Sequence, residues 1–261
     1  MTSAGRGALF ALVASLLACG GGIDLSDKDQ PTVAQVHSTS YTAINVEVDY
    51  QVGAEPYVGS AGLIGDVWQI AKDNITRAFK ATNKTATIPN TLAGMEPLTD
   101  YKQASFTSNQ ILSLAAEHRG TRSAGTTAAF YVVFLNGLYD DGTGAKNDIL
   151  GVSLGGSGVI AIFKRVISGQ ESGLPGVTKV LEQSTLVHEL GHAFGLVRDG
   201  VALTSAHEDG AHAHHCANDK CVMSWSAERV GSAVAVAKSF LATGTTVIYA
   251  ADCLADLDAA K

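Results

Sequence analysis

Two periods of apolar residues along the chain predict strands and helices. Apolar side chains at every second position of residues 43–52 predict a strand with one buried face. Apolar residues at helical spacing over residues 61–80 predict an amphipathic helix. The uninterrupted apolar segment 130–135 predicts a strand that is covered on both faces.

Shorter signals complete the expected order of elements. A strand is expected at residues 85–88, before Pro89, and a helix from Ser108, as its N-cap, to Arg119. Residues 151–163 predict a strand interrupted by Gly155 and Gly156, and a helix is expected from residue 181. Strands and helices in this order indicate an α/β or α+β sheet with helices packed on it.

Composition supports one globular domain after the N-terminal region. Of 261 residues, 46% are hydrophobic and only 16% are charged, which excludes a disordered chain. The net charge of -7 disfavours nucleic-acid binding. Residues 41–261 contain no repeat and no long linker, so we interpret them as one domain with an N-terminal lobe at about 41–195 and a smaller C-terminal lobe at about 196–261.

The first forty residues resemble an export signal followed by a tether. Arg6 precedes an apolar segment at residues 7–18, which is shorter than the roughly twenty residues of a membrane span. Leu16-Leu17-Ala18-Cys19 resembles a bacterial lipobox, which implies cleavage after residue 18 and lipid attachment at Cys19. The resemblance implies a cell-envelope lipoprotein, and Gly20 favours the outer membrane; an ordinary secretory signal is the alternative. Residues 19–40 are expected to form a flexible tether.

Six of the eight histidines lie between positions 188 and 215. The first two belong to His188-Glu189-Leu190-Gly191-His192. On a helix, residues i and i+4 share a face, so both imidazoles can reach one zinc ion. Glu189 would then lie beside the ion and accept a proton from its water. The competing interpretation is a solvated helix face with two ordinary histidines.

Two longer patterns sharpen this prediction. Gly195 gives the pattern HExxHxxG, and residues 215–223 give HCxxxxCxM. Together they resemble the metzincin clan of zinc peptidases and, within it, the archaemetzincin family. The resemblance implies a mixed, mostly parallel twisted sheet, zinc ligands at His188, His192 and His215, a general base at Glu189, and a Met-turn at Met223. Met223 is alternatively an ordinary core residue.

The third ligand is where the sequence departs from the family. The family places this histidine three residues after the glycine, but Arg198 occupies that position and His215 lies twenty residues after Gly195. An insertion must therefore loop out before His215. His207, within that insertion, is the alternative third ligand.

Three cysteines remain after Cys19: Cys216, Cys221 and Cys253. In archaemetzincins four cysteines hold a second, structural zinc, but Ala250 replaces the first cysteine of the later pair here. The resemblance therefore implies three thiolates completed by a histidine of the insertion, His212 or His214. A disulfide between Cys216 and Cys221, with Cys253 unpaired, is the alternative.

These features predict a monomeric zinc endopeptidase that hydrolyses proteins or peptides with metal-activated water and Glu189 as the base. An extended substrate would pair with the edge strand expected at residues 151–160. A zinc-binding surface lipoprotein without catalytic activity is the alternative. Both interpretations include contact with a membrane through Cys19 and exclude nucleic acid.

Overall fold

The computed structural model describes residues 30–170 and 173–260. The predicted signal segment and Cys19 lie outside these residues, so the structure does not test them. Among the described residues, no helix is both long enough and apolar enough to cross a membrane.

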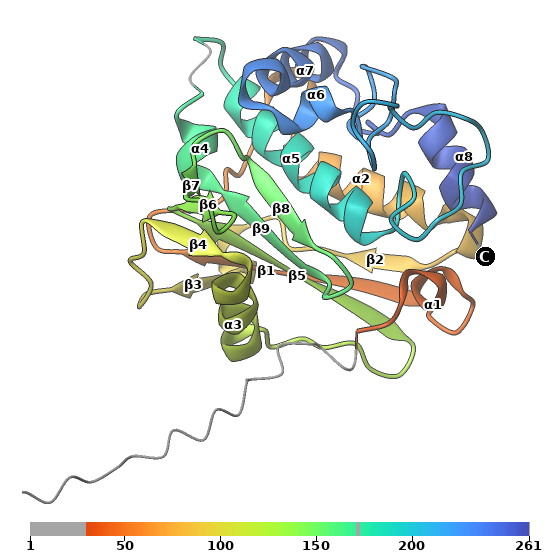
Figure 1. Cartoon of the computed structure of the whole chain (residues 1–261), viewed down its shortest axis with the longest axis horizontal. Helices are drawn as coiled ribbons and strands as arrows, with labels where there is room; N and C mark the ends of the chain where they lie inside the picture. The colour runs from red at the N-terminus through yellow and green to blue at the C-terminus, as the bar shows by residue number, and fades with distance from the viewer. Residues whose placement is uncertain (1–29, 171–172, 261) are drawn as a thin grey trace, which may run out of the picture.

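A mixed, mostly parallel sheet forms the centre of the molecule, as the sequence predicts (Figure 1). Its strands run in the order β2-β1-β5-β9-β8, and β3 pairs with the far end of β1. All pairs are parallel except β8 with β9, which are antiparallel. The strands are β1 (Ala43–Gln51), β2 (Thr85–Thr87), β3 (Glu96–Leu98), β5 (Thr127–Leu135), β8 (Gly151–Leu154) and β9 (Val159–Phe163). A small second sheet contains β4 (Ser105–Thr107), β6 (Leu138–Asp140) and β7 (Ala145–Lys146).

Helices cover both faces of the main sheet. In Figure 1 α2, α5, α6, α7 and α8 gather on one side of it, and α3 lies on the other. The helices are α1 (Val33–His37), α2 (Gln69–Ala78), α3 (Ser108–His118), α4 (Lys164–Ser168), α5 (Val177–Ala193), α6 (Trp225–Glu228), α7 (Val230–Thr243) and α8 (Ala251–Ala259). Short 3-10 turns occur at η1 (Gly62–Ile64), η2 (Lys80–Thr82) and η3 (Leu92–Gly94).

Two expected helices differ at their ends. The helix expected at 61–80 is shorter because Gly65 has a φ of 73°, which interrupts the helical backbone between η1 and α2. The N-cap of helix α3 lies one residue earlier than expected. Thr107, not Ser108, is its N-cap, and Thr107 exchanges hydrogen bonds with Gln110 in a capping box.

The end of the expected tether is packed rather than free. Residues 33–37 form α1, whose Val36 and His37 are buried. His37 Nε2 donates a hydrogen bond to the carbonyl of Phe194, just after α5, at 2.9 Å. Within the segment 19–40 that was expected to be a flexible tether, residues 33–37 therefore form a helical turn that packs against the end of α5.

The interrupted strand at 151–163 is a hairpin. Gly156 and Gly158 take positive φ values of 74° and 66° in the turn, and β8 folds back against β9. Strand β8 forms an edge of the described sheet and lies beside α5. The position of this edge strand agrees with the sequence-based expectation.

Candidate metal centre

Helix α5 runs through the middle of the protein and contains the first residues of the site. Thirteen residues of this helix are buried, because the sheet covers one side of the helix and α2 and α7 pack on the other. His188, Glu189 and His192 lie in its last two turns. A helix that is covered all round holds its side chains in fixed rotamers, which a metal site requires.

Three histidines converge at the end of α5. The ligand nitrogens of His188, His192 and His215 all lie within 4.8 Å of one another. His188 Nε2 and His192 Nε2 are 3.1 Å apart, and the ring of His215 lies 5.4 Å and 5.3 Å from their centroids. The structure thus brings together the two helical histidines and the distant one.

A hydrogen bond between Nδ1 and an oxygen atom fixes the orientation of each of the three rings. His188 Nδ1 donates to the Val222 carbonyl at 2.7 Å, and His215 Nδ1 donates to the Ala213 carbonyl at 2.9 Å. His192 Nδ1 lies 2.5 Å from an Asp199 oxygen. Because carbonyl and carboxylate oxygens only accept, each Nδ1 carries a proton, and a neutral ring then keeps the lone pair of Nε2 for a metal. Zinc-binding histidines show the same arrangement, with the outer nitrogen fixed by an oxygen.

The convergent nitrogens fit a metal ion. His215 Nε2 is buried but has no hydrogen-bond partner of suitable geometry, although buried polar atoms are normally paired. Burial, followed by the neighbouring charge of His192, lowers the pKa of His188 to about 3. Neutral imidazoles are the form that binds zinc, and three of them leave a fourth position open.

The insertion after α5 delivers His215 to this place. Gly195 ends the helix with a φ of 89°, and the next residues continue the turn, with Val197 and Arg198 also at positive φ. The chain then returns so that Ala217 N donates to the His207 carbonyl and Asp209 N to the His215 carbonyl, both at 2.7 Å. His207 lies in this returning segment but outside the cluster of three histidines.

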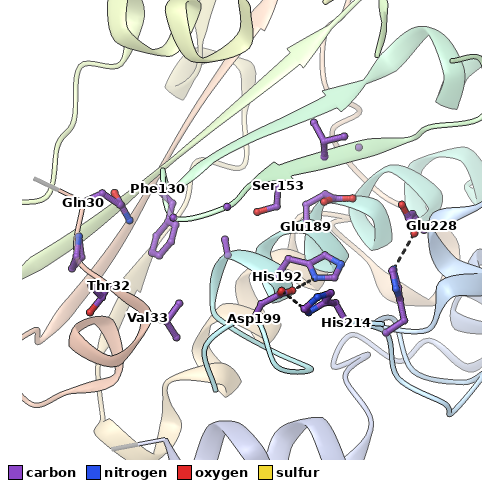
Figure 2. A pocket seen from close by; sticks show the side chains of 18 of the residues that line it. Gln30, Thr32, Val33, Phe130, Ser153, Glu189, His192, Asp199, His214 and Glu228 are labelled. Atoms are coloured by element: carbon purple, nitrogen blue, oxygen red, sulfur yellow. Dashed lines mark hydrogen bonds and ion pairs between the residues drawn. The ribbon is translucent and has the colours of Figure 1, made fainter. Parts of the chain in front are cut away.

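Glu189 lies beside the histidines, under the edge strand. Burial raises the pKa of its carboxyl well above the usual range, and the nearby charge of Glu228 adds to this effect. Strand β8 is so close that a Cβ at Gly151 would lie 2.9 Å from Glu189 Cγ. A cleft of about 390 Å³ opens between the hairpin, Glu189 and the histidines (Figure 2).

Met223 lies directly beneath the site. It is fully buried, and a Cβ at Gly191 would lie only 2.2 Å from its sulfur. The glycine between Glu189 and His192 therefore allows the methionine to approach the helix backbone. The carbonyl of Val222, the residue before Met223, accepts the hydrogen bond from His188 Nδ1.

Two residues of the site were not predicted from the sequence. Asp199 accepts hydrogen bonds from His192 Nδ1 and lies 2.8 Å from His214 Nδ1. Glu228, on α6, lies 2.9 Å from His215 Nε2. A carboxylate seven residues after His192 is a weak signal for Asp199. Nothing in the sequence around Glu228 indicates that α6 would turn it toward His215.

A second group of histidine and cysteine side chains could also hold a metal ion. Ligand atoms of His207, Cys216 and Cys253 lie within 4.8 Å of one another. Cys221 Sγ is 3.6 Å from Cys253 Sγ. The buried carboxylate of Asp256 lies 2.6 Å from His207 Nε2 and so turns Nδ1 of that ring toward Cys216, at 3.5 Å.

The structure places these side chains differently from three of the expectations. His207 lies with the cysteines and not with the helical histidines. His212 and His214 do not lie with the cysteines, because His212 stacks on Trp225 at 3.9 Å and His214 pairs with Asp199. Cys216, Cys221 and Cys253 are all free thiols, so the structure contains no Cys216–Cys221 disulfide. At the position of the missing cysteine, the Ala250 backbone N donates to Cys221 Sγ at 3.2 Å.

Comparisons with known proteins add a similarity of overall structure. The sequence matches no protein-family model and no curated protein closely enough to indicate a relationship. The chain is similar to the crystal structure of archaemetzincin from Methanopyrus kandleri, with 11% identity and a TM-score of 0.46 over 84% of this chain and 96% of that one. It is also similar to a zinc-dependent peptidase from Methanocorpusculum labreanum, with 11% identity and a TM-score of 0.46 over 81% of this chain and 99% of that one. At this level of similarity, function has to be inferred from the side chains of the site.

Proposed function

We propose that this protein is a zinc-dependent peptidase whose metal is held by His188, His192 and His215. The observation that carries the proposal is the convergence of three Nε2 atoms whose Nδ1 atoms are all fixed by oxygens. A buried carboxylate, Glu189, lies at the same place. Three neutral ligands with an adjacent base are the donor set of hydrolytic zinc enzymes.

When bound there, zinc would polarise a water molecule and the carbonyl oxygen of the substrate. The protein's own residues supply the proton transfers. Glu189 accepts the proton of the attacking water and returns it to the leaving amine. Its raised pKa suits this role, because a carboxylate with high proton affinity is a better base near neutral pH. The Ser153 backbone opposes this rise through a hydrogen bond and keeps the carboxylate oriented.

Strand β8 supports a peptide as the substrate. Within the described sheet it pairs only with β9, so its outer backbone groups face the cleft. Val152 and Ser153 line that cleft opposite His192. An extended peptide can bind to such an edge through main-chain hydrogen bonds, which places its backbone carbonyl near the histidines.

The substitution Glu189→Gln tests the catalytic proposal. It preserves the shape and hydrogen-bonding capacity of the side chain but removes the base. We expect the variant to retain zinc and the wild-type melting temperature while losing at least about a hundredfold in kcat, the usual contribution of a general base. The assay is hydrolysis of a mixed library of internally quenched peptides, read by fluorescence and mass spectrometry.

Two outcomes would contradict the proposal. Equal hydrolysis by wild type and variant would remove Glu189 from the reaction. Zinc binding without hydrolysis of any peptide in the library would support the alternative, a zinc-binding protein without catalytic activity.

We also propose a second, structural zinc site formed by His207, Cys216, Cys221 and Cys253. One imidazole and three thiolates are a common set for structural zinc, and the buried Asp256 orients the imidazole. Cys253→Ser should reduce bound zinc by one ion per chain, whereas Ser205→Ala, which removes a hydroxyl that donates to Asp252 on α8, should leave the zinc content unchanged. Metal analysis after dialysis measures both; an unchanged zinc content in the cysteine variant would refute the site.

Finally, we propose that the chain is exported and lipid-anchored at Cys19. The support is the apolar segment that ends in Leu16-Leu17-Ala18-Cys19. Mass spectrometry of the membrane fraction should detect a diacylated N-terminal cysteine in the wild type and none in Cys19→Ser. Recovery of unmodified wild-type protein from the medium would favour the ordinary secretory signal.

A further inference from the structure

We infer that residues 30–33 close one end of the cleft and restrict the peptidase to substrates with few residues beyond the scissile bond on that side. We call residues 30–33 the N-terminal strap. The inference rests on the proposed peptidase function and adds a substrate class to it, namely short peptides and the ends of longer chains. It narrows the endopeptidase that the sequence predicts to an enzyme that cuts near a chain end.

The N-terminal strap crosses the cleft from one rim to the other. The hairpin of β8 and β9 forms one rim, and the turn that follows α5 forms the other. At the hairpin, a Cβ at Gly158 would lie only 2.6 Å from the side chain of Gln30. At the turn, a Cβ at Gly200 would lie 2.8 Å from Val33 Cβ, and a Cβ at Gly195 would overlap Val33. The strap therefore packs tightly on both rims.

The strap lies at one end of the cleft. Figure 2 shows Gln30, Thr32 and Val33 at this end, Glu228 at the other, and Glu189 between them. Strand β8 begins beside Glu189 and runs toward the hairpin turn on which Gln30 packs. A peptide that pairs with β8 and extends toward this turn therefore meets the strap.

The length of β8 limits the room on this side. A Cβ at Gly151 would lie 2.9 Å from Glu189 Cγ, so the proposed base lies beside the first residue of the strand. The strand ends at Leu154, and Gly158 lies in the turn that follows. An extended peptide advances about 3.3 Å per residue, as the strand does, so it reaches the strap about three residues from the scissile bond.

The strap is fixed by polar contacts as well as by packing. Arg119 Nη2 donates hydrogen bonds to Gln30 Oε1 at 3.1 Å and to a backbone carbonyl of β5 at 2.6 Å. Pro31 is buried, and its ring fixes the φ angle at this position. Thr32 and Gln35 form a capping box at the start of α1. A segment held in this way excludes substrate atoms instead of moving aside for them.

The strap therefore predicts a length limit on one side of the scissile bond only. A longer peptide has to overlap the strap or leave the edge of β8, which costs as much as overpacking a site. We expect kcat/KM to fall at least about tenfold when the substrate extends more than about three residues toward the strap. Extension on the other side should change kcat/KM by less than about threefold.

Nested peptides measure this limit. A peptide that the wild type cleaves is lengthened with serine and glycine, one residue at a time, separately at its amino and carboxyl ends. Liquid chromatography with mass spectrometry gives kcat/KM and the position of the cut. The series in which kcat/KM falls identifies the end of the substrate that faces the strap. Constant kcat/KM along both series overturns the inference.

A double variant tests whether the strap causes the limit. Val33→Asp puts a carboxylate against the backbone of two glycines, where it loses water, and Gln30→Ala removes the contact with Arg119. With both substitutions the fall in kcat/KM should shrink to less than about threefold. Ala34→Asp adds the same charge at the next, exposed position of α1 and should keep the wild-type limit. An unchanged limit in the double variant overturns the inference.

Binding gives a readout that does not depend on turnover. In the Glu189→Gln background, fluorescence anisotropy gives Kd for the shortest and longest peptides of the limited series. The longest peptide should bind at least about tenfold more weakly with the wild-type strap, and about equally well with the double variant. Equal Kd values for both peptides with the wild-type strap contradict the inference.

Two controls keep the test decisive. If the melting temperature shows that the double variant is unfolded, Val33→Ala combined with Gln30→Ala removes the same contacts without a buried charge and should also weaken the limit. Failure of the peptidase proposal is distinguishable, because zinc-loaded wild type would then cleave no peptide of any length. Failure of this inference leaves cleavage intact without a length limit.

Discussion

The contact between Gly191 and Met223 allows a quantitative test of the packing beneath the site. In Gly191→Ala the added Cβ would lie 2.2 Å from Met223 Sδ and 3.2 Å from Tyr249 Cε1. Non-bonded atoms normally lie about 3.5–4 Å apart, so the sulfur or the helix has to move by more than about 1 Å. Overpacking of this kind costs about 1–3 kcal/mol, and we expect about 3 kcal/mol because the methionine is fully buried.

Helix propensity offsets part of this cost. Alanine favours a helix over glycine by about 1 kcal/mol, which leaves a net loss of about 2 kcal/mol in the free energy of unfolding. Urea unfolding at one fixed free zinc concentration measures it, since bound metal adds its own stabilisation. The control is Gly231→Ala on α7, where nothing lies within 4 Å of the added carbon. We expect that variant to be neutral or more stable.

A double-mutant cycle isolates the contact itself. In a Met223→Ala background the clash is absent, so Gly191→Ala should be neutral or stabilising there, with a coupling energy of about 3 kcal/mol. If Gly191→Ala costs the same in both backgrounds, the methionine does not lie against this glycine and the description of the site floor is wrong.

The remaining predictions concern metal affinity and pH. Asp199→Asn should weaken zinc binding at the three-histidine site about 10–100-fold, because the outer hydrogen bond orients His192; chelator competition measures this, and an unchanged affinity would argue against that role. Burial raises the pKa of Asp49 to about 6, opposed by a hydrogen bond from Tyr131 and increased by Glu47. Because the carboxyl pKa is raised in the folded protein, the contribution of Asp49 to the free energy of unfolding is greatest below about pH 4 and falls as the pH rises through about 6. Asp49→Asn should therefore remove a pH-dependent loss of stability on the order of 2 kcal/mol. Urea unfolding of both proteins at pH 4 and 8 checks this, and equal pH dependence in wild type and variant would exclude Asp49 as its source.

Local patterns in the sequence predict most of the sheet and the first half of the site. Alternation at residues 43–52 and the apolar segment 130–135 correspond to β1 and β5, and the i, i+4 spacing puts His188 and His192 on one helix face. Periodicity alone does not mark where an element ends. At Gly65 a single positive φ outweighs the helical pattern on both sides.

Contacts between residues that are far apart in the sequence decide which of the candidate residues lie together. The choice between His207 and His215 depends on a buried carboxylate, Asp256, that is far away in sequence and holds His207 beside the cysteines. Glu228 was not predicted for the same reason, since its contact with His215 depends on how α6 packs after the Met223 turn. Neither contact leaves a periodic signal in the chain.

Zinc content in histidine variants tests the central arrangement most directly. His215→Ala should lose one zinc ion per chain relative to wild type after dialysis against metal-free buffer. His212→Ala, in the same insertion but stacked on Trp225, should lose none. A His215→Ala protein that keeps the full wild-type complement of zinc would contradict the three-histidine site.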